Sequence, residues 1–194
     1  MTGVLLAGGS GTRLAPTTEV YNKHLALVYD APMALKPLET LRGMGCDSAI
    51  IVSSPQGTSD LARLVKDGSD YGLEVKYKIQ NEPGGVAQAL GCVANEGLVG
   101  VFPVVLADCY FDPSPEMPKK PTIMWNHYEF ANQHATYDPE THTIVEKRVK
   151  DIGDKAIIGA YFYDERVFDI IPTLEPSARG ELEIADINNW YIHN

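Results

Sequence analysis

A glycine-rich stretch near the start of the chain limits what the chain can fold into more than any other feature. Residues 4–7 are an apolar run, long enough for a buried strand and too short for a helix. Three glycines follow within four residues, and they leave backbone N–H groups open to a ligand because no side chain covers them. These glycines are Gly8, Gly9 and Gly11. Arg13 and Lys23 add positive charge, so the stretch predicts a strand, a tight turn and a phosphate-binding loop.

Spacing separates this stretch from two other glycine loops. The ATPase loop needs a glycine followed directly by Lys and then Ser or Thr, but Gly11 is followed by Thr12 and Arg13. The dinucleotide-binding fingerprint needs a third glycine where Leu14 stands, and a proline soon afterwards interrupts the helix that should follow. Asp30 could still imitate the ribose-binding acid of that fingerprint, so a dinucleotide-binding protein stays an alternative. A glycine-rich hairpin without a ligand is the structural alternative.

The composition favours a single α/β domain that covers residues 1–194. The chain has 16 basic and 26 acidic residues, which gives a formal net charge of −10. Such a surface repels polyanions, so we expect neither a nucleic acid nor a membrane as a partner. The sequence shows no secretory signal and no apolar run of membrane-spanning length, so we expect a cytoplasmic protein. The oligomeric state stays open, and a homo-oligomer is one option.

The first half of the chain alternates short apolar runs with helical stretches. We expect strands at residues 4–7, 49–53, 74–79 and 101–106. We expect helices at residues 32–44, from Thr58 or Ser59 to Gly68, and at 86–95. Strands that alternate with helices form a parallel sheet with right-handed connections and helices on both faces. The sequence therefore predicts a Rossmann-like α/β fold with a mostly parallel sheet.

Polar residues follow three of these strands at the point where each strand ends. The glycine loop follows the first strand, Gln80 and Gly85 follow the third, and Asp108 follows the fourth. In an open α/β sheet, ligands bind beyond the carboxyl ends of the strands, so we expect these residues to share one site. The structural alternatives are that Gln80 simply ends its strand and that Asp108 caps the next turn.

The second half of the chain has a different pattern. Residues 112–121 are dense in proline and predict a surface connection. Further strands are expected at 122–126, 134–137, 143–147 and 156–163, and helices at 165–171 and 183–192. We expect this half to form an appended layer that walls the site.

Several motifs, in this order along the chain, resemble those of the sugar-1-phosphate nucleotidyltransferases. They are LAGGSGTRL at 6–14, NKHL at 22–25, Gln80 with GVAQAL at 85–90, LAD at 106–108, Glu146 with Lys147, GAYFYD at 159–164 and SARGELEIADIN at 177–188. The resemblance runs over nearly the whole chain and is weakest between residues 110 and 143. It is strongest to the thymidylyltransferase branch of that family, and it is more specific than any single glycine loop. It implies the nucleotide-diphospho-sugar transferase type of α/β fold.

The resemblance implies a nucleotide-binding half at residues 1–109. In that half the loop from Gly8 to Arg13, with Gly9, Gly11 and Thr12, would hold a nucleoside triphosphate, and Arg13 would contact its phosphates. Lys23 would bridge the α-phosphate and the incoming sugar phosphate. Gln80 and Gly85 would contact the pyrimidine base, and Asp108 would hold Mg²⁺.

The resemblance also implies a sugar-phosphate-binding half at residues 110–194. Glu146, Lys147 and Arg179 would position the sugar phosphate. Of these, Arg179 has the least obvious structural explanation, because an arginine on a glycine-flanked loop usually binds an anion. Glu146 and Lys147 could instead be ordinary residues of an exposed strand.

The chain departs from the family pattern at and after the metal-binding motif. Ala107 and Cys109 flank Asp108 where glycine and asparagine are usual. Family members continue beyond the closing helix to a Trp-x-Asp-x-Gly segment, whose aspartate is a second metal ligand. This sequence ends at Asn194, so we expect a short form without that carboxylate, for which Asp112 could substitute.

The implied reaction suits the residues that are present. A sugar-1-phosphate is already an anionic nucleophile, so its attack on an α-phosphate needs alignment and charge neutralisation and no deprotonating base. The resemblance implies Mg²⁺-dependent transfer of a nucleotidyl group from dTTP to glucose-1-phosphate, with release of pyrophosphate. The alternative is a catalytically impaired module that binds a nucleotide or sugar nucleotide without turnover.

Overall fold

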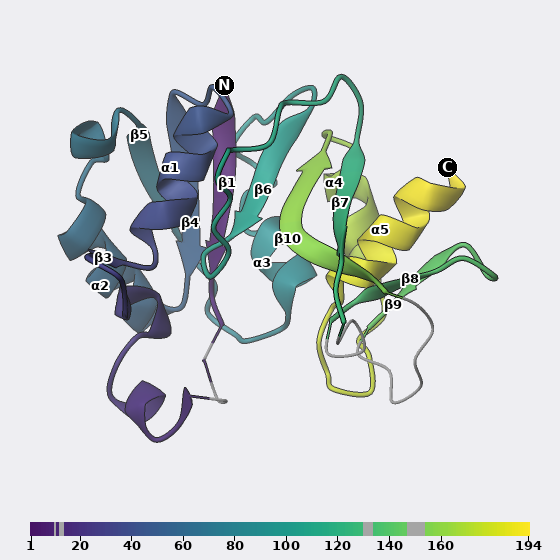
Figure 1. The fold of residues 1–194 in the computed structure, drawn as a ribbon, viewed down its shortest axis with the longest axis horizontal. Helices are drawn as coiled ribbons and strands as arrows, with labels where there is room; N and C mark the ends of the chain where they lie inside the picture. Colours follow the sequence, from purple (N-terminus) through teal and green to yellow (C-terminus); the bar gives the residue numbers. More distant parts are fainter. Residues whose placement is uncertain (10, 12–13, 130–133, 147–153) are drawn as a thin grey trace.

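The computed structural model describes residues 1–9, 11, 14–129, 134–146 and 154–194 (Figure 1). The strands of the first half are β1 Thr2–Ala7, β2 Leu27–Val28, β3 Ala31–Pro32, β4 Ser48–Ser53, β5 Glu74–Ile79 and β6 Phe102–Leu106. Those of the second half are β7 Thr122–His127, β8 Thr136–Asp138, β9 Thr143–Val145 and β10 Lys155–Tyr163. In the described part of the chain, eight of them form one sheet in the order β5-β4-β1-β6-β10-β8-β9, with β7 also paired to β10.

The first half of the sheet is parallel, as predicted. Strand β1 lies at its centre, with Val4 opposite Ile50 of β4 on one side and opposite Val104 of β6 on the other. Alternate side chains of β1 enter two separate cores, Val4 and Leu6 on one face and Leu5 on the other. Because both faces are buried, the strand is an unbroken apolar run, which is typical of a parallel sheet covered on both sides.

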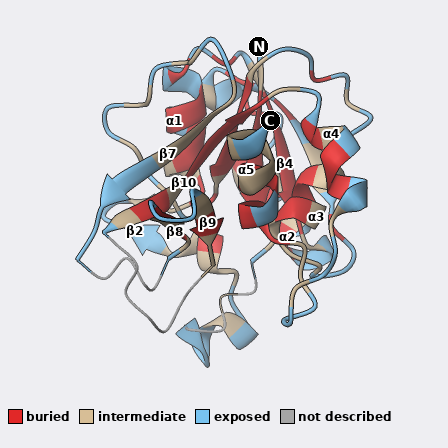
Figure 2. Ribbon diagram, turned by 90° about the vertical axis from the view of Figure 1, so that its right-hand side faces the viewer, coloured by how far each residue is buried: buried red, intermediate tan, exposed pale blue. Residues whose placement is uncertain are grey.

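Helices cover both faces of the sheet, which confirms the predicted fold class (Figures 1 and 2). The helices are α1 Leu35–Gly43, α2 Pro55–Val65, α3 Val86–Gly91, α4 Val167–Ile170 and α5 Ile184–His193. Residues of α1 and α2 pack into the core that contains Leu5, whereas α3, α4 and α5 pack into the core that contains Val4. In Figure 2 the buried residues concentrate in the sheet and on the helix faces turned toward it.

Two helices of the first half begin at other residues than predicted. Helix α2 begins at Pro55, because the hydroxyl of Ser54 accepts a hydrogen bond from Gly57 N at 3.1 Å and caps the first turn. Thr58 and Ser59 therefore lie inside the helix and do not cap it. Helix α1 begins three residues later than predicted, because Ala31–Pro32 pairs with Leu27–Val28 in a short hairpin.

The second half continues the same sheet, so the expectation of an appended layer was wrong. Strand β10 runs antiparallel to β6, with Tyr161 opposite Val104, and it also pairs antiparallel with β7 and β8. Its side chains alternate between the two cores, since Phe162 enters the core of Leu5 and Tyr163 enters the core of Val4. Strand β10 is buried along most of its length, which is typical of a strand inside a sheet and not of a layer that covers one.

The proline-dense segment at 112–121 contains no helix or strand, as predicted. Among the described residues no helix has the length and apolar character needed to span a membrane. The carboxyl ends of β1, β4, β5 and β6 lie at the same edge of the sheet, since these strands are parallel. Any side chains that follow those strands therefore gather at one edge.

Candidate active site

The carboxyl ends of the parallel strands open onto a cleft of about 730 Å³. Most residues predicted for the site line this cleft. They are Gly8, Gly9, Gly11, Lys23, Gln80, Gly85, Asp108 and Arg179. The cleft thus combines residues from three strand ends with one from the loop before α5. Thr12, Arg13 and Lys147 belong to the same prediction and lie outside the described residues.

The glycines of the loop are required by close packing against the cleft. A Cβ atom on Gly8 would overlap the side-chain oxygen of Gln80, and one on Gly9 would lie 3.0 Å from Lys23 Nζ. Gly11 has a φ of +69°, which L-residues with side chains rarely adopt. Its carbonyl accepts hydrogen bonds from Leu14 N and from Thr18 Oγ1, both at 2.8 Å. A bare backbone therefore lines this side of the cleft.

Lys23 and Asp108 form an ion pair within the cleft. The Lys23 ammonium donates to Asp108 Oδ2 at 2.6 Å, and the two side chains are 19% and 47% exposed. Burial raises the pKa of Asp108, but the hydrogen bond and the charge of Lys23 outweigh burial and leave the pKa below its ordinary value. Asp108 is therefore a carboxylate at neutral pH. Both partners remain accessible enough to exchange their contact for one with a ligand.

Gln80 is held in one orientation at the end of β5. It is only 6% exposed, and its backbone N–H donates to Ser53 O at 2.8 Å. Its amide nitrogen donates to Gly85 O at 3.1 Å and to Gln88 Oε1 at 2.6 Å. The side chain thus does more than end a strand, because it connects β5 to the first turn of α3. No separate feature of the sequence indicated a role for Gln88.

Gly85 begins α3 with a backbone that needs glycine. Its φ is +98°, and a Cβ atom there would lie 2.5 Å from Leu182 O. Ala87 N and Leu182 N donate to Leu182 O and Gly84 O at 3.2 and 2.8 Å, so the start of α3 is fastened to the segment that precedes α5. This contact joins the two halves of the chain at the edge of the cleft.

Arg179 has acidic partners inside the protein, which the sequence did not indicate. Its Nη2 lies 2.8 Å from both carboxylate oxygens of Glu183 and 3.6 Å from Glu181 Oε2. The hydrogen bond to Glu183 raises the pKa of Arg179. Ser177 Oγ also donates to Glu183, at 2.7 Å. The ion pair with Glu183 therefore gives Arg179 a structural role that the sequence did not indicate. Arg179 also lines the cleft.

Glu146 directly follows β9. It is not among the residues that line the cleft. Its negative charge raises the pKa of Arg179, and it also adds to the raised pKa of the buried Tyr161. The electrostatic coupling shows that Glu146 belongs to the same neighbourhood as Arg179.

His24 lines the cleft and was missed as a site residue. It is 2% exposed, and neither ring nitrogen has a hydrogen-bond partner among the described residues. Burial, and secondly the charge of Lys23, lowers its pKa from 6.5 to about 4, while Asp108 and the carbonyls of Ala7 and Ala107 oppose that change. A neutral imidazole therefore stands between the ends of β1 and β6. The only signal in the sequence was its position next to Lys23.

The donor set fits a magnesium ion that is bound partly through a substrate. Asp108 is ionised, partly exposed and placed at the edge of the sheet. The described residues contain no cluster of three or more His, Cys, Asp or Glu side chains that could hold a metal, and Asp112 does not line the cleft. Mg²⁺ commonly takes one or two carboxylates and completes its shell with phosphate oxygens and water. Asp108 by itself can supply the one carboxylate that such a magnesium ion needs.

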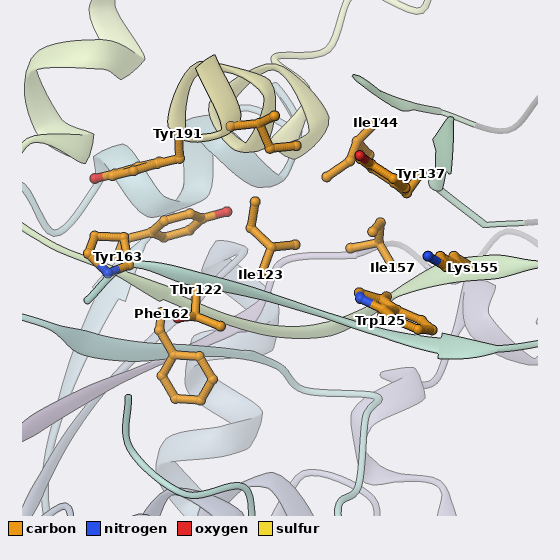
Figure 3. A pocket seen from close by; sticks show the side chains of 12 residues that line it. Thr122, Ile123, Trp125, Tyr137, Ile144, Lys155, Ile157, Phe162, Tyr163 and Tyr191 are labelled. Atoms are coloured by element: carbon orange, nitrogen blue, oxygen red, sulfur yellow. The ribbon is translucent and has the colours of Figure 1, made fainter. Parts of the chain in front are cut away.

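A second hollow, of about 410 Å³, lies between β7, β10 and α5 (Figure 3). Its lining is mostly apolar and aromatic, and no residue predicted for the site belongs to it. The Lys155 ammonium there lies 4.6 Å from the ring centre of Trp125 and 5.7 Å from that of Tyr137. This cation is stabilised by the two rings. The cleft at the strand ends is therefore the candidate active site.

Comparison with known proteins assigns the class. A sequence profile described as "Nucleotidyl transferase" matches residues 2–112, more than half of the chain. The chain belongs to this family and is an enzyme of the nucleotidyltransferase class. Its relatives include the glucose-1-phosphate thymidylyltransferases of Neisseria meningitidis serogroup A and Mycolicibacterium smegmatis, at 34% and 35% identity. Each alignment covers 100% of this chain and 72% or 71% of the relative.

Solved structures support the same class. A Bacillus anthracis protein described as a glucose-1-phosphate thymidylyltransferase, crystallised with sucrose, superposes with a TM-score of 0.88 at 31% identity. The match covers 100% of this chain and 83% of that one. A UDP-glucose pyrophosphorylase bound to UDP-glucose superposes with a TM-score of 0.81 at 19% identity, which shows a shared fold. Because the chain belongs to the nucleotidyltransferase family, the alternative of a dinucleotide-binding protein is dropped.

Proposed function

We propose that the chain transfers a nucleotidyl group from dTTP to glucose-1-phosphate in a Mg²⁺-dependent reaction that releases pyrophosphate. The observation that carries the proposal is the single cleft in which the glycine loop, the pair of Lys23 and Asp108, and Arg179 meet. Relatives at about one third identity are named for that activity. A negatively charged protein needs such a local group of cations and backbone donors to bind two anionic substrates.

In the proposed reaction an oxygen of the sugar phosphate attacks the α-phosphorus of the triphosphate. The bond between that phosphorus and the bridging oxygen breaks, and pyrophosphate leaves. No general base is required, because the nucleophile is already ionised. The task of the protein is to hold the two anions in line and to neutralise charge as it moves to the leaving group.

The nucleotide-binding half, residues 1–109, would hold the triphosphate. Backbone N–H groups of the loop at Gly8, Gly9 and Gly11, together with Thr12 and Arg13, would bind its phosphates. Gln80 would contact the base, since packing against Gln88 and Gly85 already fixes its carboxamide. The missing side chain at Gly85 would let the base approach the backbone.

Lys23 and Asp108 would act at the reacting phosphates. Lys23 would leave its partner and contact the α-phosphate and the incoming sugar phosphate. Asp108 would hold Mg²⁺, which when bound would neutralise charge on the phosphate oxygens. The imidazole of His24 would stay neutral beside this pair, so it would add no further positive charge there.

The sugar-phosphate-binding half, residues 110–194, would position the nucleophile. Arg179 and Lys147 would supply the cations, and Glu146 would accept hydrogen bonds from sugar hydroxyls. Glu183 holds the Arg179 guanidinium with three contacts, so the arginine would bind the phosphate in a fixed orientation.

One observation favours the alternative of a binding module without turnover. Asp108 is the only carboxylate predicted to hold the metal, and the described residues contain no cluster of three ligands. In that case the nucleotide would bind in the same cleft, and pyrophosphate would not be released.

A substrate panel tests the proposal. Triphosphates are paired with sugar-1-phosphates in the presence of Mg²⁺, and pyrophosphate release is measured. We expect the highest kcat/KM for dTTP with glucose-1-phosphate and no release when either substrate is omitted. Saturable nucleotide binding without release in any combination would support the binding module and contradict the proposed reaction.

A further inference from the structure

Strand β9 has only one strand beside it, yet its outer edge is not left to solvent. It pairs with β8, where Ile144 lies opposite Tyr137, and the described residues place no strand on its other side. The side chain of Asn189 in α5 occupies that edge instead. Asn189 Oδ1 accepts from Ile144 N at 2.6 Å, and Asn189 Nδ2 donates to Ile144 O at 2.9 Å.

The geometry makes Asn189 a substitute for a neighbouring strand. In a strand, the N–H and C=O groups of one residue point to the same side, so those of Ile144 point away from β8. A carboxamide carries a donor and an acceptor in the same arrangement as a peptide group, and it can therefore satisfy both at once. Figure 3 shows Ile144 beside Tyr137 and close to α5.

This clamp lies next to a predicted site residue. Ile144 is buried, and Glu146 follows it by two residues, directly after the end of β9. A strand of three residues in a two-stranded hairpin has little stability of its own. Glu146 therefore takes its position from whatever fixes β9, and Asn189 supplies two hydrogen bonds that fix it from the open side.

The same helix also holds Arg179. Glu183 is the residue directly before α5, and its carboxylate binds the Arg179 guanidinium at 2.8 Å. Six residues later, Asn189 binds the backbone of β9. Arg179 is thus bound at the start of α5 and the strand that leads to Glu146 along its side, and the charges of Glu146 and Arg179 interact.

We propose that Asn189 is a positioning residue that, through α5, sets the distance between Glu146 and Arg179 and so selects the sugar phosphate. The inference rests on the proposed function, because it assigns these two residues to that substrate. Asn189 touches neither substrate in this account. It acts only through the backbone of Ile144.

The test compares the Michaelis constants of the two substrates in three variants. N189L removes both hydrogen bonds at similar volume, and N189D keeps only the acceptor for Ile144 N. We expect N189L to raise the KM for glucose-1-phosphate about tenfold, the effect of losing roughly one net hydrogen bond, while the KM for dTTP stays within about twofold. N189D should raise the same constant by about threefold. The matched control is N194L, since Asn194 is exposed and, among the residues that the structure describes, its side chain bonds only to Trp190 O at 2.9 Å.

Each outcome of the kinetic test supports or overturns the positioning role of Asn189. Equal increases in both Michaelis constants, no increase in either, or a fall in kcat alone would overturn the positioning role, since a merely structural residue gives these results. Wild-type turnover reports separately on the proposed function. If the wild type released no pyrophosphate, amide hydrogen exchange would still test the clamp. Faster exchange at Ile144 and Glu146 in N189L than in N194L supports it, and equal exchange overturns it.

Discussion

The two halves of the cleft hold their polar groups in different ways. On the side proposed to bind the nucleotide, the groups follow buried parallel strands, and Gln80 and Gly8 are positioned by backbone that lies in the core of the sheet. On the side proposed for the sugar phosphate, Arg179 lies on a loop and Glu146 follows a short edge strand. Glu183, directly before α5, and Asn189 in α5 hold these two segments. The first half depends on the fold as a whole, whereas the second depends on a few side-chain contacts.

This difference affects what substitutions should do. A change on the nucleotide side should alter stability and turnover together, because the groups share the core. A change on the sugar-phosphate side should alter the affinity for one substrate and leave stability nearly unchanged. Single substitutions on each side can separate these two kinds of effect.

The largest effect is expected for Lys23→Met. The ammonium contacts Asp108 at 2.6 Å in the cleft and would stabilise charge at the reacting phosphates. We expect kcat to fall about a thousandfold, as for removal of other preorganised charge-stabilising donors. Pyrophosphate release under saturating substrates measures it. Lys66→Met is the control, because Lys66 pairs with Asp70 at 3.3 Å on the surface, and a similar loss there would contradict the assignment.

His24 should make the nucleotide side sensitive to acid. Its pKa is about 4 in the folded protein and 6.5 in the unfolded chain, so between these values the unfolded chain binds more protons and stability rises with pH. The contribution is full above pH 6.5 and is lost as the pH falls toward 4, by up to about 3 kcal/mol. Urea unfolding between pH 4 and 7 should show this dependence reduced in His24→Gln. Identical pH profiles for both proteins would refute it.

Gly85→Ala should destabilise the junction between the halves. A Cβ atom there would lie 2.5 Å from Leu182 O, and the φ of +98° adds strain. The matched control is Gly97→Ala, since Gly97 has a φ of +70° and no atom within 4 Å of its Cβ position. We expect the free energy of unfolding to fall by about 2 kcal/mol more in Gly85→Ala than in the control. Equal losses would mean that the close approach to Leu182 costs nothing.

The smallest effect is expected for Arg179→Met. The KM for glucose-1-phosphate should rise about tenfold, equivalent to about 1.4 kcal/mol, because one cation of the site is lost. The KM for dTTP and the unfolding midpoint should stay close to those of the wild type. Arg63→Met is the control, since Arg63 is 82% exposed and pairs with Asp60. A change confined to dTTP would reverse the assignment of the two halves.

The parallel half could be predicted from the sequence because its signals are local. An apolar run followed by glycines, and polar residues directly after strands, give both the elements and the edge at which they meet. Gly8, Gln80 and Asp108 therefore line one cleft as expected. The start of α2 was misplaced because Ser54 and Pro55 form a cap just before the residues chosen for it.

The other half depends on contacts between residues far apart in the sequence. Asn189 and Ile144 are 45 residues apart, and nothing near either residue indicates that they meet. Glu183 is only four residues from Arg179, but the loop between them contains no helix or strand that would indicate the contact. His24 was missed because burial, which decides its chemistry, is set by the ends of β1 and β6.

Following the α-phosphorus of dTTP shows whether the chain transfers a nucleotidyl group to the sugar phosphate. The chain is incubated with Mg²⁺, glucose-1-phosphate and dTTP labelled at either the α- or the γ-phosphorus. We expect the α-label to enter a sugar nucleotide and the γ-label to leave in pyrophosphate. The proposed reaction would be contradicted if the α-label stayed in dTTP, or if it left as dTMP without joining the sugar phosphate.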